Sequence, residues 1–121
     1  MEIKKTIVLG ASPNPARYSF KAVKSLLRFN HEVIPVGFRP GVIYDNFIQR
    51  GMPEINDVHT IALYIGIERQ EEYHDYILSL QPKRIIFNPG TINELFIEEL
   101  EALGIEVVEG CTLVMLDSGE F

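Results

Sequence analysis

Paired cysteines and long apolar runs are both missing from this chain of 121 residues. Its single cysteine, Cys111, excludes an intrachain disulfide and a cysteine-rich metal site. No apolar stretch approaches the length of a membrane span, and the first residues lack the basic and apolar sections of a signal peptide. We therefore expect a cytoplasmic protein that does not enter a membrane.

Basic residues are also scarce, because 11 lysines and arginines stand against 17 aspartates and glutamates, for a formal net charge of −6. Nucleic-acid binding depends on a basic surface that releases counterions from the phosphate backbone, so we expect no nucleic-acid partner. Hydrophobic residues make up 46% of the chain and charged residues 23%, which is typical of globular proteins. The length suits one hydrophobic core, and we predict a single domain over residues 1–121.

Sequence patterns for catalysis are missing as well. No Gly-x-Ser-x-Gly elbow is present, and His31, His59 and His74 lack the spacing of metal ligands. We predict no catalytic residue and no metal site. Because catalytic groups can assemble from distant positions, the sequence leaves open whether the protein is an enzyme.

Short apolar runs alternate with helical patterns, which is the order of elements expected for a parallel α/β sheet. Apolar residues at helical spacing predict helices over 19–27, 73–80 and 91–103, the last with capping-box spacing between Thr91 and Glu94. Segment 37–57 predicts a long excursion with a short strand at 42–44. We predict a doubly wound, mainly parallel five-stranded sheet in the order 3-2-1-4-5, with strands at 6–9, 32–36, 58–65, 84–87 and 106–108.

Residues 6–19 predict an anion site, since an apolar strand runs through a glycine-containing loop into an amphipathic helix. The first N–H groups of a helix lack intrahelical partners and its dipole is positive there, so a phosphate can bind. Gly10 would let the backbone approach this ligand. Ser12 and Ser19 would supply hydroxyl donors, and Arg17 would supply charge. The alternative is a plain β-α turn that binds nothing.

The loop differs from the NAD fingerprint, which requires further glycines and an acidic residue at the end of the second strand. After Gly10 the chain reads Ala-Ser-Pro-Asn-Pro, and Arg39 follows the second strand where the acid would stand. A cation at this place suits an additional ribose phosphate. Both NADP and coenzyme A (CoA) carry one, so charge alone does not separate these two ligands.

Four runs of sequence carry a resemblance to a known family: Val-Leu-Gly-Ala-Ser-Pro-Asn-Pro (8–15), Glu-Val-Ile-Pro-Val (32–36), Arg-Ile-Ile-Phe-Asn-Pro-Gly-Thr (84–91) and Gly-Ile-Glu-Val-Val-Glu-Gly-Cys-Thr-Leu-Val-Met-Leu (104–116). Together they resemble the small bacterial CoA-binding proteins, which are similar to the N-terminal CoA-binding domain of the succinyl-CoA synthetase α-subunit. The resemblance implies a Rossmann-like fold that binds CoA or an acyl-CoA at the carboxyl ends of the strands. It implies no established reaction.

The resemblance also implies a set of contact residues. It puts the pyrophosphate on the loop after the first strand, the adenosine end beside the second strand and the pantetheine arm along the loop after the fourth. The end of the third strand is less polar here than in many relatives, which leaves its contacts the least defined. The implied residues are Gly10, Ala11, Ser12, Arg17, Ser19, Gly37, Arg39, Ile65, Asn88, Pro89 and Gly90.

Cys111 follows the last predicted strand, whose carboxyl end should open on the same crevice. There it would meet the CoA thiol as a redox partner, the alternative being a small side chain in the core. The sequence thus predicts a non-catalytic CoA-binding carrier, sensor or docking module. An NADP-dependent oxidoreductase and a nucleotide-binding interaction protein with a vestigial phosphate site stay open as alternatives, as does assembly into a homodimer or with a protein partner.

Overall fold

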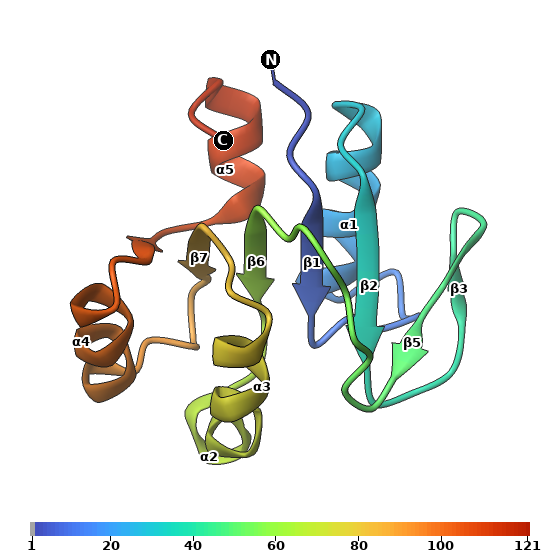
Figure 1. Ribbon diagram of the computed structural model, residues 1–121. Helices are drawn as coiled ribbons and strands as arrows, with labels where there is room; N and C mark the ends of the chain where they lie inside the picture. The colour runs from blue at the N-terminus through green and yellow to red at the C-terminus, as the bar shows by residue number, and fades with distance from the viewer. Residues whose placement is uncertain (1) are drawn as a thin grey trace.

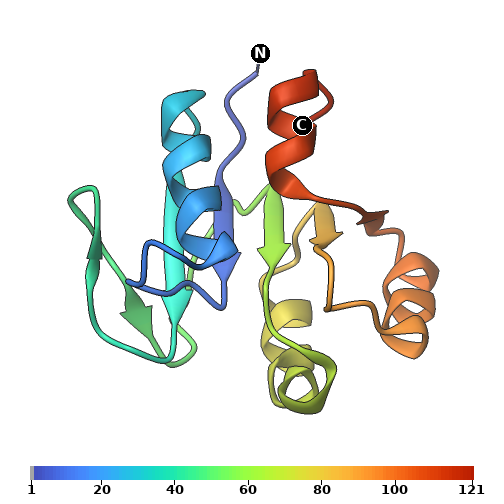
Figure 2. The same ribbon diagram turned by 180° about the vertical axis from the view of Figure 1, so that it is seen from behind.

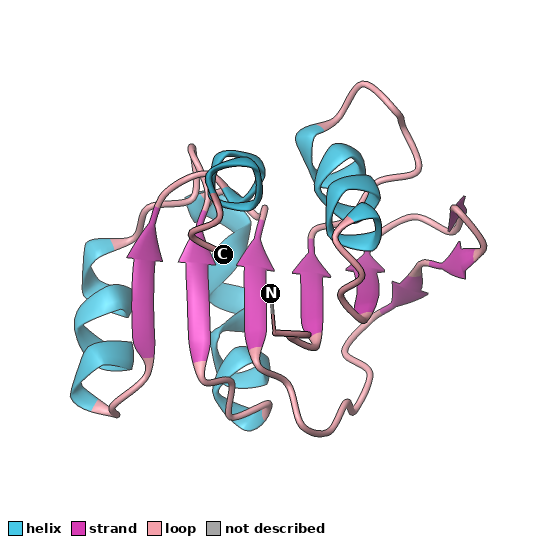
Figure 3. Cartoon of the chain, turned by 90° about the horizontal axis from the view of Figure 1, so that it is seen from above, coloured by secondary structure: helices cyan, strands magenta, loops and turns pink. Residues whose placement is uncertain are grey.

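The computed structural model describes residues 2–121 and contains a six-stranded parallel sheet with helices on both faces (Figure 1). The strands lie in the order β5-β2-β1-β6-β7-β8. A separate antiparallel hairpin projects beside the β5 edge, as the view in Figure 3 shows. The sheet strands are β1 (Thr6–Leu9), β2 (Val33–Gly37), β5 (Gln49–Arg50), β6 (Thr60–Leu63), β7 (Arg84–Phe87) and β8 (Glu106–Glu109), and the hairpin pairs β3 (Val42–Ile43) with β4 (Asn46–Phe47).

Two helices cover one face of the sheet and three cover the other. On one face α1 and α5 contact each other, and Figure 2 shows both in front of the strands. Between β6 and β7 a short 3₁₀ turn, η1, joins α2 to α3 on the opposite face, where α4 also packs. The bounds are α1 (Tyr18–Arg28), α2 (Ile67–Gln70), η1 (Glu71–Tyr73), α3 (His74–Ser79), α4 (Glu94–Ala102) and α5 (Thr112–Ser118).

The predicted α/β fold class is confirmed, but the predicted strand order is wrong. The third predicted strand, β6, pairs with β1 in the register Thr6↔Thr60, so the five predicted strands follow the order 2-1-3-4-5. The physical reason lies in excursion 37–57, which supplies its own strand, β5, to the outer edge of β2 through the pairing Val36↔Gln49. That edge is therefore occupied, and the reversal of winding falls between β1 and β6.

One local prediction needs correction, and one helix lies outside the predicted set. Helix α4 is capped by Asn93, whose side-chain oxygen accepts the Phe96 N–H at 3.2 Å, while the Thr91 hydroxyl donates to the Asn88 carbonyl. Helix α5 was not predicted, because seven residues are too few to establish a helical period in the sequence. It ends at Gly119, which adopts the left-handed conformation typical of a helix C-terminus.

The three central strands are buried along their whole length, because helices cover both of their faces. Alternate residues point to opposite layers. Val8 packs with the side chains of α1 and α5, whereas Ile7 and Leu9 pack with those of α3 and α4. The continuous apolar runs that predicted these strands are thus explained by burial on two sides.

At the amino-terminal end of the sheet, His31 is buried against the last residue of the chain. Its Nδ1 accepts the Lys4 N–H at 3.0 Å, which requires that nitrogen to be unprotonated, and its ring lies 4.8 Å from the Phe121 ring. Burial, followed by the positive charges of Lys4 and Arg84, lowers the pKa of His31. The folded protein therefore favours the neutral imidazole.

We predict that acid destabilises the fold through this histidine. Because the folded-state pKa of His31 lies below its unfolded value, the unfolded chain binds more protons, and stability falls as the pH drops below about 6.5. Thermal melting between pH 7.5 and 5 measures this loss. A His31→Gln variant should be less stable at neutral pH but have a shallower pH dependence, and an unchanged slope would contradict the assignment.

Candidate functional site

An open cleft of about 810 Å³ lies at the carboxyl ends of the strands, where the winding of the sheet reverses between β1 and β6. Its walls come from the loops that follow β1, β2, β6, β7 and β8. Segments far apart in the sequence therefore meet at one site. The lining residues are Gly10, Ala11, Ser12, Asn14, Ala16, Arg17, Tyr18, Ser19, Phe38, Arg39, Tyr64, Arg69, Asn88, Pro89 and Cys111.

Most of the predicted site residues line this cleft. Gly37, Ile65 and Gly90 do not, although each adjoins a residue that does. Among the lining residues that sequence reasoning missed are Phe38 and Arg69. A signal for Arg69 existed, because it is a cation near the start of the segment that follows the third predicted strand.

The loop after β1 is fixed to the end of β2 by backbone contacts. The N–H groups of Gly10 and Ala11 both donate to the Val36 carbonyl, at 2.8 and 2.9 Å. A Cβ atom on Gly37 would lie 2.1 Å from the Ala11 carbonyl oxygen, so only glycine permits this approach. Gly37 does not line the cleft, but it allows the loop that forms the cleft wall to contact the end of β2.

Gly10 has a backbone requirement of its own. Its φ is +96°, in the region that favours glycine, and an added Cβ would lie 2.9 Å from the Tyr64 carbonyl oxygen. The structure therefore explains this glycine by the packing between the ends of β1 and β6. This packing reason is separate from the expected approach of a ligand to the Gly10 backbone, which would take place on the exposed side of the loop.

Beyond Ala11 the loop is braced by its own side chains. The Ser12 hydroxyl oxygen accepts the Asn14 N–H at 3.1 Å, and the Asn14 side-chain oxygen accepts the Ala16 N–H at 3.0 Å. These local hydrogen bonds set the direction in which the chain enters α1. The loop is consequently held in shape without a ligand.

The amino terminus of α1 opens on the cleft. Arg17 occupies the N-cap position with no side-chain capping bond, and no acidic residue lies in the first turn. The positive end of the helix dipole is therefore not offset by the protein. Ser19 lies in this turn, lines the cleft and is largely buried. An anion placed here would meet N–H donors and a hydroxyl group together.

Three guanidinium groups, those of Arg17, Arg39 and Arg69, line the cleft, and none of the lining residues is acidic. The two ion pairs found among residues 2–121 join Lys5 to Glu32 and Arg28 to Asp117, and so involve none of these arginines. In a protein with a formal charge of −6, the charged side chains that line this cleft are thus all positive. Such a cleft favours a ligand with several negative groups.

Asn88 is fully buried, and its side chain joins three elements. Its Nδ2 donates to the Leu63 carbonyl at 3.1 Å, while its Oδ1 accepts the Thr112 N–H at 2.8 Å and the Thr112 hydroxyl at 3.0 Å. The amide group is therefore engaged with β6 and α5. Asn88 acts on the cleft by positioning its wall, and neighbouring Pro89 supplies exposed surface.

Cys111 lies at the N-cap of α5 and is half-buried, with its side of the cleft shared by Tyr64. Burial raises the pKa of the Tyr64 phenol well above its ordinary value, so this hydroxyl is neutral at physiological pH. Cys111 is thus placed at the wall of the cleft and not in the core. The connection between β8 and α5 contains no arginine, so it adds no positive charge to this end of the cleft.

Two features are absent from residues 2–121, the part of the chain that the structure describes. No helix there has both the length and the apolar character needed to cross a bilayer. No group of three or more His, Cys, Asp or Glu side chains there is arranged to hold a metal ion.

A parallel sheet wound in both directions, with a cleft at the point of reversal, defines a Rossmann-like domain. Within that class, the chain belongs to the CoA binding domain family, whose model matches residues 4–117. No curated protein matches the chain.

Several solved structures share the fold. One, described as an uncharacterized protein, is 48% identical, with a TM-score of 0.97 and complete coverage of both chains. A conserved hypothetical protein from Pyrococcus furiosus is 27% identical, with a TM-score of 0.79 and coverage of 95% of this chain and 99% of that one. A hypothetical protein from Pyrococcus horikoshii OT3 is 21% identical, with a TM-score of 0.83 over 97% and 84%, a likeness of fold alone.

The close approach behind the cleft generates a prediction about stability. Gly37→Ala should destabilise the protein by about 3 kcal/mol or more, because the Ala11 backbone cannot move away as a side chain could. Gly110→Ala is the matched control. A Cβ there would have its nearest neighbour, a side-chain carbon of Val108, at 3.6 Å, and we expect a change within about 0.5 kcal/mol. Urea unfolding measures both variants, and equal stabilities would contradict the packing argument.

Proposed function

We propose that the protein binds CoA or an acyl-CoA in this cleft and acts without catalysis of its own, as a carrier, sensor or partner-docking module. The observation that carries the proposal is the presence of three guanidinium groups without a carboxylate partner, those of Arg17, Arg39 and Arg69, in the cleft on which the terminus of α1 opens. CoA carries three phosphate groups, which such a site would neutralise. Membership of the CoA binding domain family favours this ligand over NADP.

The proposed pose follows the lining of the cleft. The pyrophosphate lies at the first turn of α1, where Ser12, Arg17 and Ser19 join the loop backbone. The ribose phosphate meets Arg39 at the end of β2. From there the pantetheine arm passes Pro89 on the wall held by Asn88 and ends near Cys111. Gly37, Ile65 and Gly90 contribute through the backbone shape of the loops.

The ribose phosphate gives the first test of this pose. In titration calorimetry CoA should bind more tightly than dephospho-CoA. Arg39→Ala should weaken the binding free energy of CoA by about 1.5–3 kcal/mol, the scale of a hydrogen bond to a charged group. The same variant should leave dephospho-CoA nearly unaffected. Arg50→Ala, an exposed arginine outside the cleft, is the control. Equal affinity of the wild type for the two ligands would remove this role from Arg39.

The thiol end gives a second test. On incubation with CoA disulfide, the Cys111 thiolate should attack one sulfur, forming a mixed disulfide and releasing one equivalent of CoA thiolate. Intact-mass measurement should show a single adduct of CoA on the folded protein. Cys111→Ser is the control and should gain no mass. Absence of an adduct on the wild type would show that the thiol does not reach the ligand.

A further inference from the structure

One contact crosses the cleft from side to side. Phe38 follows β2, and Arg69 lies in α2 after β6, so the two residues come from opposite sides of β1. The Arg69 guanidinium carbon lies 3.8 Å from the centroid of the Phe38 ring, and both residues line the cleft. This cation–π pair therefore spans the carboxyl end of β1.

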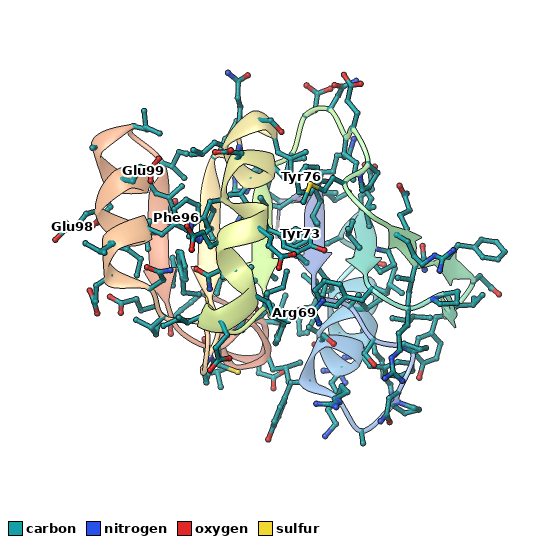
Figure 4. The ribbon with its side chains drawn as sticks, turned by 90° about the horizontal axis from the view of Figure 1, so that it is seen from below. Arg69, Tyr73, Tyr76, Phe96, Glu98 and Glu99 are labelled. Atoms are coloured by element: carbon teal, nitrogen blue, oxygen red, sulfur yellow. The ribbon has the colours of Figure 1, made fainter. Side chains whose placement is uncertain are left out.

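The two members of the pair are held differently. Phe38 is supported on one side by Tyr73, whose ring lies 5.7 Å away at an interplanar angle of 77° and is itself buried. Figure 4 shows Arg69 and Tyr73 along the side of α2 and η1 that faces away from α4. Arg69 is exposed and takes part in neither ion pair of the described chain. The ring is thus anchored by Tyr73, whereas no ion pair holds the guanidinium group.

Phe38 also retains exposed surface, with 39% of the residue accessible. Exposed cation–π contacts are weak, whereas a base stacked on an aromatic ring is held by its whole flat face. A planar ligand group can therefore compete with Arg69 for the ring. A guanidinium group displaced in this way would remain at the cleft, where it can pair with a phosphate.

We propose that the Phe38–Arg69 pair is an exchange site for the purine base of the ligand. The base displaces the Arg69 guanidinium from the Phe38 ring and stacks there, and the displaced Arg69 turns onto a ligand phosphate. Recognition of the base and recognition of the phosphates are thereby coupled through one side chain. This inference rests on the proposed function, because it requires a ligand that carries both a purine and phosphates.

The test compares, by calorimetry, the affinities for three ligands: CoA and its two fragments, adenosine 3′,5′-bisphosphate and 4′-phosphopantetheine. Phe38→Leu should lower the affinity for CoA and for the bisphosphate about tenfold or more, since both carry a base. It should change the affinity for 4′-phosphopantetheine, which has no base, less than twofold. Phe38→Tyr retains the ring and should retain the affinity. Phe47→Leu, an exposed aromatic outside the cleft, is the matched control for loss of a ring.

Arg69→Ala separates exchange from simple contact. It should lower the affinity for the bisphosphate, because a phosphate partner is lost. It should raise the affinity for unphosphorylated adenosine at least twofold, because Arg69 no longer competes for the Phe38 ring. Weakening of both ligands would overturn the exchange. Equal losses of affinity for all three ligands in Phe38→Leu, or no loss, would overturn the base site.

These outcomes are distinguishable from failure of the proposed function. A wild-type protein that binds the bisphosphate but not CoA refutes CoA binding and leaves the base site standing. Binding of CoA that does not respond to Phe38→Leu refutes the base site alone. A wild-type protein that binds none of the three ligands refutes both.

Discussion

The meeting of Gly37 with the Ala11 carbonyl oxygen is the constraint on which the candidate site depends. It lets the ends of β1 and β2 approach until the Val36 carbonyl accepts two N–H groups of the loop. That loop leads directly into α1, so its position determines where the open helix terminus points. Core packing alone would keep the strands in register. The direction of the loop depends on glycine at position 37, because any side chain there would collide with the Ala11 carbonyl oxygen.

Charge distribution connects this geometry to binding. Acidic residues outnumber basic ones over the chain, yet the cleft contains three arginines and no carboxylate. Asn88 contributes without any charge, because its buried amide group joins the ends of β6 and β7 to α5 and keeps the opposite wall in place. The site therefore combines a rigid frame with exposed cations. A pre-formed frame lowers the conformational entropy lost on binding a flexible ligand.

Sequence reasoning located much of the cleft because the loop after β1 is local: strand, glycine, turn and helix follow one another along the chain. The strand order could not be predicted, because the edge strand β5 comes from segment 37–57, in which the sequence pattern indicates a strand only at 42–44. The same limit applies to Phe38 and Arg69. Their contact depends on β2 and β6 flanking β1, and nothing in either local sequence indicates the other residue.

The central claim is that CoA places its phosphates at the first turn of α1. The most direct measurement is an NMR titration of ¹⁵N-labelled protein with CoA, following the backbone amide resonances. The account predicts that the largest saturable shifts fall on the loop after β1 and on Tyr18 and Ser19, with smaller shifts around Arg39 and Pro89. Shifts confined to the β3–β4 hairpin or the exposed face of α4, with those amides unmoved, would contradict it.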